Sequence, residues 1–411
     1  MRRLFIATVG IGRADEDIIP PLTESIREAS PDFLLLLVTQ RSKPKGEEIV
    51  KNLDRSRDNY QIHPLSADEW DVEALFKEMY EVVYRLIKER AIAPQDVICD
   101  FTTGTKPMSA ALAFVAVRLG LGRLKYIKVR RNECGYAVSG TERTITFEPH
   151  GFQASLMLRS ALELMYHYRF DSVLQILEGL QEGLLNEPER RLKQALTKLA
   201  YAYAGWDLFD HCRFASNYRQ AEPEKIPELA DFMVSDETVD LLDELGRKGR
   251  QGKYCELMVV DLLNNARRRI EEGKYDDALA RLYRTCELIA QLRLRARGID
   301  NSNVELDKVP EKSRRWLENY RTREGRIEIG LAKSYQLLTE MDDELGKRFT
   351  GDPELQAILN ERNYYILAHG CKPIAGRTAE KLLEKVEGIA KSFVAEFQRK
   401  RELLKFPWSR F

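Results

Sequence analysis

The sequence has no excess of charge of either sign. Its 65 Lys and Arg residues balance 65 Asp and Glu residues over 411 residues, so the formal net charge is zero. A uniformly basic surface is therefore excluded, and any binding of nucleic acid must come from a local patch. The chain also lacks an apolar run of about 18 residues, which excludes a conventional membrane-spanning helix and a membrane partner.

Cysteine and histidine are scarce as well. The six cysteines and five histidines are scattered, without a C-x-x-C pair or a histidine cluster. This spacing predicts neither a disulfide framework nor a metal site. The apolar run that follows the first basic residues is too short for a signal peptide. We therefore expect a cytoplasmic protein with reduced thiols, most of them buried.

The first 150 residues alternate between strand and helix patterns. RLFIATV and DFLLLLVTQ are short, continuous apolar runs, which are typical of strands buried on both faces. Alternation with helical segments predicts an α/β fold with a parallel, doubly wound sheet. From about residue 152 helical periodicity prevails to the end. We therefore predict an α/β domain (1–150), a helical middle region (151–250) and an all-helical C-terminal domain (251–411).

Three loops follow the carboxyl ends of predicted strands, where a doubly wound sheet binds its ligands. The third, DFTTGTK (100–106), combines hydroxyl groups, a glycine and a lysine just before a helix whose free N–H groups attract anions. We predict that it cradles phosphate, although its spacing is not that of a Walker loop. The candidate ligand-binding residues of the three loops are Thr8, Gly10, Ile11, Gly12, Thr39, Ser42, Asp100, Thr102, Thr103, Gly104, Thr105 and Lys106.

A second constellation lies near the C-terminus, in NERNYYILAHG (360–370). A helix predicted to begin at Pro353 and to end just after His369 would bring Arg362 and His369 to nearly the same face. Arginine is a permanent cation for phosphate, and histidine exchanges a proton near neutral pH. Such a pair suffices to cut RNA through its own 2′-hydroxyl without a metal ion. Taken alone, an arginine and a histidine on a helix are more often an ordinary surface pair.

Two basic stretches are further candidates for contact with an RNA backbone. They are ARRRIEEGKY (266–275) and QLRLRARG (291–298), both predicted to be helical. A run of charges on a helix is more often a solvated face, and that alternative stays open from sequence.

Both constellations resemble known motifs. The TVG that ends the first predicted strand and the D-F-T-T-G-T-K stretch resemble the CARF domain, the Rossmann-like sensor of CRISPR-associated proteins. The usual pattern there is D-x-T-G-G-T-K, so Thr103 replaces the first glycine. Arg362 to His369 resembles the R-x(4–6)-H motif of HEPN ribonucleases. Together they resemble the CARF–HEPN ribonucleases of type III CRISPR systems.

This resemblance implies a homodimer that binds a cyclic oligoadenylate across its two-fold axis, with cyclic tetra-adenylate favoured over hexa-adenylate. The ligand would activate cleavage of single-stranded RNA in paired HEPN domains. By the same resemblance, Arg362 is the phosphate cation, His369 handles the proton and Asn363 orients His369 or the RNA. No cofactor or metal is implied.

Three questions stay open from the sequence. The sensor domain could slowly cleave its own ligand, with Thr8, Ser42 and Lys106 as the residues to test. The chain could instead be a non-catalytic sensor of cyclic oligonucleotides. It could also be a CARF-type transcription regulator, although no convincing helix-turn-helix with a basic recognition helix is present.

Overall fold

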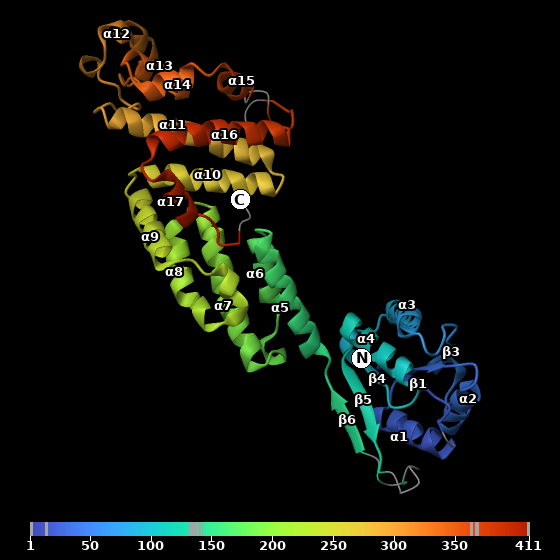
Figure 1. Ribbon diagram of the computed structural model, residues 1–411. Coiled ribbons are helices and arrows are strands. Elements are labelled where there is room, and N and C mark those ends of the chain that lie inside the picture. Colours follow the sequence, from blue (N-terminus) through green and yellow to red (C-terminus); the bar gives the residue numbers. More distant parts are fainter. Residues whose placement is uncertain are drawn as a thin grey trace. The chain divides into compact units, whose positions relative to one another are not determined.

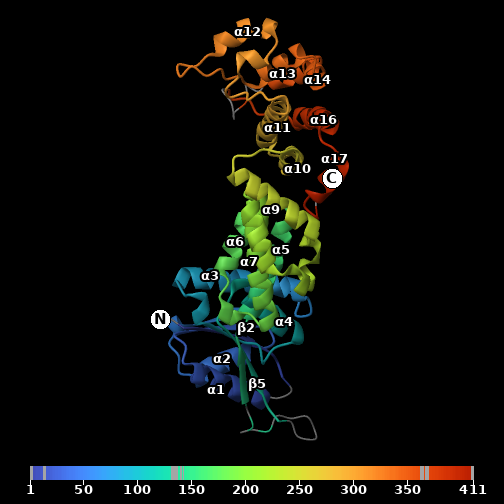
Figure 2. The same cartoon turned by 90° about the vertical axis from the view of Figure 1, so that its left-hand side faces the viewer.

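The computed structural model describes residues 3–12, 15–130, 138, 141, 143–361, 365 and 370–408. The chain divides into two compact units. The first contains Met1–Arg159 and Leu180–Arg190, and the second contains Ser160–Gly179 and Arg191–Phe411. Figures 1 and 2 show a strand-containing first unit and a helical second unit.

The first unit is built on a six-stranded sheet of order β3-β2-β1-β4-β5-β6. Its strands are β1 (Leu4–Val9), β2 (Phe33–Val38), β3 (Tyr60–Pro64), β4 (Val97–Asp100), β5 (Arg123–Lys128) and β6 (Arg143–Phe147). The first five are parallel, as predicted, whereas β6 pairs antiparallel with β5 at the edge. The α/β class with a doubly wound sheet is therefore confirmed, and the antiparallel edge strand is an addition to it.

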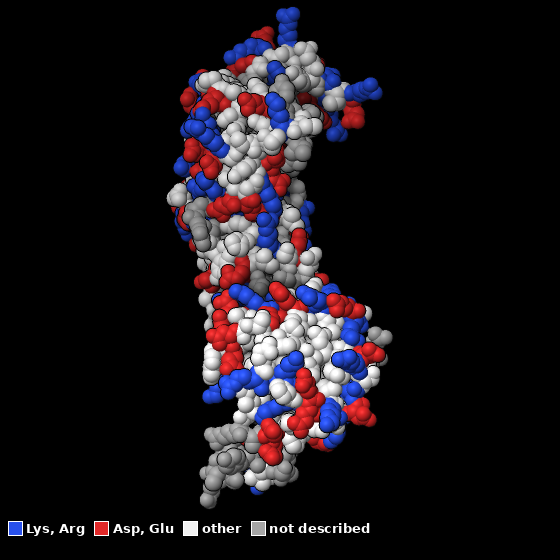
Figure 3. All heavy atoms as spheres, turned by 90° about the vertical axis from the view of Figure 1, so that its right-hand side faces the viewer, with Lys and Arg blue, Asp and Glu red and all other residues white. Residues whose placement is uncertain are grey.

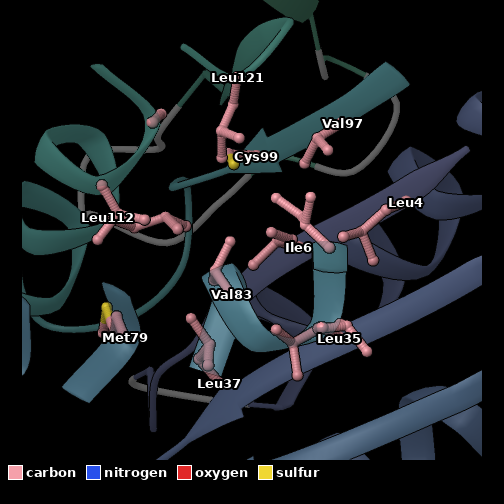
Figure 4. Close-up of a cluster of buried hydrophobic side chains, with 14 of the residues drawn as sticks. Leu4, Ile6, Leu35, Leu37, Met79, Val83, Val97, Cys99, Leu112 and Leu121 are labelled. Atoms are coloured by element: carbon pink, nitrogen blue, oxygen red, sulfur yellow. The ribbon is translucent and has the colours of Figure 1, made fainter. Parts of the chain in front are cut away.

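Helices cover both faces of this sheet. They are α1 (Ile19–Ala29), α2 (Lys43–Asn52), α3 (Val72–Arg90) and α4 (Lys106–Leu119). Because successive strand residues point to opposite faces, Leu4 and Ile6 of β1 pack with α3 and α4, while Phe5 and Ala7 pack with α1 and α2. Figure 4 shows the first of these two cores, with Leu35 and other side chains of the sheet facing the helices. Burial on both faces explains why β1 and β2 are continuous apolar runs.

The second unit is helical, which confirms the predicted change of character. After α5 (His150–Tyr166), which starts in the first unit, its helices are α6 (Phe170–Gly179), α7 (Glu187–Asp207), α8 (His211–Ala221), α9 (Asp236–Arg250), α10 (Glu256–Glu271), α11 (Tyr275–Arg295), α12 (Glu311–Leu317), α13 (Leu331–Glu340), α14 (Glu344–Thr350), α15 (Pro353–Glu361), α16 (Gly376–Phe393) and α17 (Phe397–Leu403). Helices α10, α11 and α16 pack against one another. None of the described helices is long and apolar enough to cross a membrane.

Candidate functional site

The predicted phosphate loop is fastened to the end of β1 by two reciprocal hydrogen bonds. The Thr8 hydroxyl donates to the carbonyl of Thr103, and the Thr103 hydroxyl donates to the carbonyl of Thr8. Both side chains are buried, at 0% and 4% exposure. Thr103, which stands where the CARF pattern has its first glycine, therefore ties the loop to the central strand of the sheet.

Two glycines allow the backbones of the loops after β1 and β4 to touch. A Cβ atom on Gly10 would lie 2.7 Å from both Cα and N of Gly104. Gly104 has φ of +117°, and a Cβ atom there would lie 2.9 Å from Oγ1 of Thr8. Such distances are well below ordinary contact, so glycine is required at both positions. The two loops thus form one continuous backbone surface at the carboxyl end of the sheet.

The loop leads directly into the N-terminus of α4. Thr105 is the N-cap residue, and its hydroxyl oxygen accepts a hydrogen bond from the backbone N–H of Met108 at 3.3 Å. Lys106 follows as the first helical residue and is exposed. The positive end of the helix dipole and the lysine charge act in the same direction, so this end of α4 favours an anion.

Asp100 supports the loop from beneath and does not face solvent. Its carboxylate accepts hydrogen bonds from Thr102 N at 2.9 Å and from Ser25 Oγ at 2.7 Å, and its exposure is 0%. Burial raises the pKa of Asp100, while these hydrogen bonds and the nearby Lys125 act in the opposite direction. Lys125 is itself buried and lies 3.0 Å from a carboxylate oxygen of Glu28. Asp100 is therefore placed to hold the loop rather than to contact a ligand directly.

The loop after β2 is held by its own side chains. Thr39 N donates to Ser42 Oγ at 2.9 Å, and Ser42 N donates to Thr39 Oγ1 at 3.2 Å. The Ser42 side chain is fully buried, whereas Thr39 is half-buried. These contacts turn the chain from β2 into α2.

Sequence reasoning missed Lys45, which lies in the first turn of α2. Its ammonium group donates to the carbonyl of Ile11 and lies 2.6 Å from a carboxylate oxygen of Asp15. Lys45 therefore positions the loop after β1 from the neighbouring helix. A lysine at the start of the helix after the second strand was the available signal.

The structure thus brings the loops after β1 and β4 into contact at one edge of the sheet. Of the twelve predicted residues, Gly12 and Lys106 are exposed, while Thr8, Gly10, Ser42, Asp100 and Thr103 are buried. The buried five hold the loops in shape, and the two exposed residues are accessible from solvent. That these residues bind a ligand stays a prediction.

The C-terminal candidates Arg362, Asn363 and His369 lie outside the described residues. The helix before them, α15, begins at Pro353 as predicted, and Asp352 caps it by accepting a hydrogen bond from Leu355 N at 3.0 Å.

The predicted continuation of this helix to His369 is wrong at Tyr365. Helix α15 ends at Glu361, and Tyr365 forms an isolated bridge with Lys372. The Tyr365 hydroxyl donates to Glu361 at 2.9 Å, and burial raises the pKa of this phenol. A bridge to Lys372 needs extended backbone, which a continuous helix does not offer. The pairing of the motif's arginine and histidine therefore rests on the motif and no longer on helical periodicity.

The chain on either side of this motif is anchored to the helical core. Lys385 of α16 lies 2.9 Å from Asp352 and 3.1 Å from Glu354, which joins α16 to the start of α15. At the start of α16, a Cβ atom on Gly376 would lie 2.8 Å from the ring of Tyr275 in α11. Both ends of the motif segment are therefore held to packed helices.

Two of the three arginines in the basic stretch 266–275 are buried in the helical unit. Arg268 is fully buried, with Nε 3.0 Å from Asp207 and its guanidinium 3.9 Å from the ring centroid of Phe406. Arg269 pairs with the same aspartate at 2.5 Å. The prediction that these arginines contact RNA is wrong, because their charges stabilise the packing of α10 against α7.

Two of the three arginines in the stretch 291–298 share an internal contact. Arg293 and Arg297 donate to one carboxylate oxygen of Asp343, with Nε distances of 2.8 and 3.0 Å. The Asp343 side chain is fully shielded from solvent and also caps α14. These two arginines are therefore structural as well.

Cysteines and other possible metal ligands are present in the described part of the chain. Within it, no group of three or more His, Cys, Asp or Glu side chains could hold a metal ion. The described cysteines are free thiols, and Cys99 and Cys286 are buried. Cys371 is exposed and two others are half-buried, so the prediction that most thiols are buried is wrong.

Comparison with known proteins finds similarity at two levels, that of a domain family and that of the overall fold. Residues 247–392 match the family model of the Csm6 HEPN domain. The chain is also similar to a solved structure described as Enterococcus italicus Csm6 bound to cyclic hexa-2′-fluoro-hexa-dAMP, with a TM-score of 0.56, 15% identity and 99% of each chain covered. No curated protein matches the sequence. The predicted resemblance to CARF–HEPN proteins and the predicted fold class are thereby confirmed.

Proposed function

We propose, for a chain with the fold of Csm6 and a C-terminal Csm6 HEPN domain, that the protein is a CRISPR-associated endoribonuclease activated by a cyclic oligoadenylate. The observation that carries the proposal is that the Arg362–His369 motif falls inside the matched residues 247–392. The similar Csm6 structure is bound to a cyclic oligonucleotide, which supports the class of activator. The glycine-paired loops and the N-terminus of α4 supply an anion-favouring edge for such a ligand.

The proposed cleavage needs only this chain's own side chains. The 2′-hydroxyl of the RNA attacks the adjacent phosphorus, and the bond to the 5′-oxygen of the next nucleotide breaks. His369 moves a proton in this exchange, and Arg362 stabilises the charge that develops on the phosphate oxygens. Asn363 orients the histidine or the RNA. The products would carry 2′,3′-cyclic phosphate and 5′-hydroxyl ends.

A second copy of the chain is proposed to complete both sites. The first unit exposes Phe114 of α4 and Tyr126, Ile145 and Phe147 of β5 and β6, at 59%, 41%, 47% and 38% exposure. Exposed apolar side chains gathered on one domain are typical of interfaces. Because α4 begins at Lys106, pairing through α4 would bring two phosphate loops towards one two-fold axis. The cyclic oligoadenylate would then favour the dimer state in which the HEPN sites are active. The size of this effect is set by the difference between its affinities for the two states.

The test is cleavage of a fluorescent single-stranded RNA in EDTA, with and without cyclic tetra-adenylate or hexa-adenylate. We expect cleavage that depends on one of the rings and that falls at least about a thousandfold in His369→Ala, since that variant lacks the proton-handling group. A substrate with 2′-deoxyribose throughout serves as the control, because it lacks the nucleophile. Undiminished cleavage by His369→Ala would refute the site assignment.

The same experiment addresses the rival functions and the ring size. Tight ring binding without cleavage in any condition would favour the non-catalytic sensor. Salt-resistant binding of duplex DNA would favour a transcription regulator. The ring that activates at the lower concentration identifies the natural activator class.

Slow cleavage of the ring by the sensor domain is an addition to this proposal. Of the three residues to test, Thr8 and Ser42 are fully buried and only Lys106 is exposed. We expect Lys106→Ala to lower any loss of labelled ring measured without RNA. An unchanged rate in this variant would remove Lys106 from that reaction.

A further inference from the structure

One stretch of the HEPN region carries a local surplus of positive charge in a chain that is neutral overall. Residues 308–333 contain eight Lys and Arg residues against four Glu residues. In contrast to the buried arginines of α10, several of these side chains are exposed. Figure 3 shows Lys and Arg atoms projecting at the top of the molecule, at the end where Figures 1 and 2 place α12.

Four exposed arginines in this stretch make no ion pair within the described residues. Arg314 and Arg315 lie on α12, and Arg323 and Arg326 lie at the tip of a short hairpin. On α12 the buried residues Ser313 and Leu317 define the inner side, so Arg315 projects directly away from it and Arg314 lies at its flank. These cations have no internal role to account for them.

The hairpin is rigid enough to present its arginines in a defined position. Thr322 N donates to the carbonyl of Arg326 at 2.7 Å, and Gly325, with φ of +85°, closes the turn. Arg321 donates to the carbonyl of Gly325 at 2.6 Å and pairs with Glu318 at 2.8 Å. Preorganised cations lose less freedom on binding than cations on a mobile loop.

Two aromatic rings lie between these cations in the sequence. Trp316 and Tyr320 have ring centroids 6.0 Å apart at an interplanar angle of 87°. The ammonium group of Lys333 lies 5.3 Å from the Trp316 centroid and 5.7 Å from the Tyr320 centroid. The Trp316 indole N–H donates to Glu340 at 3.0 Å, which fixes its orientation, and Tyr320 is 38% exposed.

We propose that the exposed arginines and the aromatic rings within residues 314–326 form an accessory binding platform for single-stranded RNA, which holds the substrate outside the cutting site. The platform consists of Arg314, Arg315, Trp316, Tyr320, Arg323 and Arg326. The arginines contact phosphates, and the exposed ring of Tyr320 stacks on a base, the combination by which proteins bind single strands without sequence preference. An acidic protein would satisfy the cations but not the aromatic ring. The proposal rests on the proposed ribonuclease function for its substrate class.

Binding is tested with the full-length protein and a long 2′-O-methyl RNA, which cannot be cut. Each arginine that contacts a phosphate adds about 0.7 to the slope of log affinity against log salt. Arg314→Ala with Arg315→Ala, or Arg323→Ala with Arg326→Ala, should therefore lower the slope by about 1.4 and the affinity about tenfold at ~0.15 M salt. The matched control is Lys253→Ala with Lys391→Ala, which removes two exposed cations that have no ion pair in the described part of the same unit.

Tyr320 tests the stacking part of the proposal. Tyr320→Ala should weaken binding about tenfold, whereas Tyr320→Phe, which keeps the ring, should bind like the wild type. A purely structural role for the hydroxyl would instead weaken binding in both variants, because Tyr320→Phe also lacks that group.

Cleavage separates this inference from the proposed function. The arginine variants should lower kcat/KM for long RNA about tenfold and leave cleavage of a short oligonucleotide that fills only the cutting site unchanged. If the wild type cuts no RNA, the proposed function fails, and the binding measurements still decide the platform. Equal RNA affinity in the platform and control variants would overturn the inference. The inference would also be overturned if an oligoglutamate bound as tightly as RNA and if the same variants lost that binding.

Discussion

The contact between the loops after β1 and β4 of the first unit can be tested by a single substitution. Gly10→Ala would place a Cβ atom 2.7 Å from backbone atoms of Gly104, whereas non-bonded carbon atoms prefer about 3.5–4.0 Å. Both partners are backbone, so no side chain can move aside, and one loop must shift by about 1 Å. Overpacking of this kind costs about 1–3 kcal/mol.

The shift would also disturb the reciprocal bonds between Thr8 and Thr103. These two hydrogen bonds contribute about 1 kcal/mol each, so we expect a total loss of about 3 kcal/mol in the free energy of unfolding of the first unit. For a unit of this size the loss lowers Tm by about 6–12 °C. Where the variant still folds, the displaced loop should weaken binding of the cyclic oligoadenylate at least about tenfold.

Differential scanning calorimetry and titration with the labelled ring measure the two effects. The control is Gly183→Ala, because a Cβ atom at Gly183 meets no atom within 4 Å. Wild-type Tm and wild-type affinity in Gly10→Ala would refute the loop contact itself. A lowered Tm with unchanged affinity would keep the contact and refute the assignment of these loops to the ligand.

Two further predictions concern buried carboxylates. Because burial raises the pKa of Asp100 in the folded state, the folded chain binds its proton more tightly than the unfolded chain, and stability should fall as the pH rises above about 4, the ordinary pKa of an aspartate. Asp100→Asn should flatten this dependence in urea unfolding, and an unchanged slope would show that Asp100 does not cause it. In the second unit, Asp343→Ala should lower the free energy of unfolding by about 3 kcal/mol. The substitution removes the cap of α14 and leaves Arg293 and Arg297 without their shared partner. Asp343→Asn, which keeps an acceptor for Leu345 N, should recover about 1 kcal/mol of this loss, and equal losses in both variants would contradict the capping role.

Much of the fold could be predicted because its signals are local. The apolar runs of β1 and β2 are continuous since both faces of these strands are covered by helices, and a run of this kind is visible in one short window. The start of α15 was equally accessible, because Asp352 and Pro353 act on the first helical turn alone. The division of the helical part into a middle region and a HEPN domain near residue 250 stays a prediction.

Errors arose where a partner distant in the sequence decides the outcome. Arg268 and Arg269 form a basic stretch in sequence, but Asp207, some 60 residues earlier, draws both inward. Tyr365 lies in an apparently helical run, yet its backbone bridges to Lys372. His211, one of the scattered histidines, lies 2.7 Å from the buried carboxylate of Asp261, some 50 residues later.

The order of strands and helices and the loop 100–106 at a strand end could be predicted from the sequence, which also contains the arginine–histidine spacing of the C-terminal motif. These depend on local periodicity, on turn residues and on short motifs. The folded chain was needed to learn which hydroxyls of the loops are buried, which arginines are paired, and which arginines of α12 make no ion pair within the described residues. Burial and pairing depend on groups brought together from distant parts of the chain, and no local pattern encodes them.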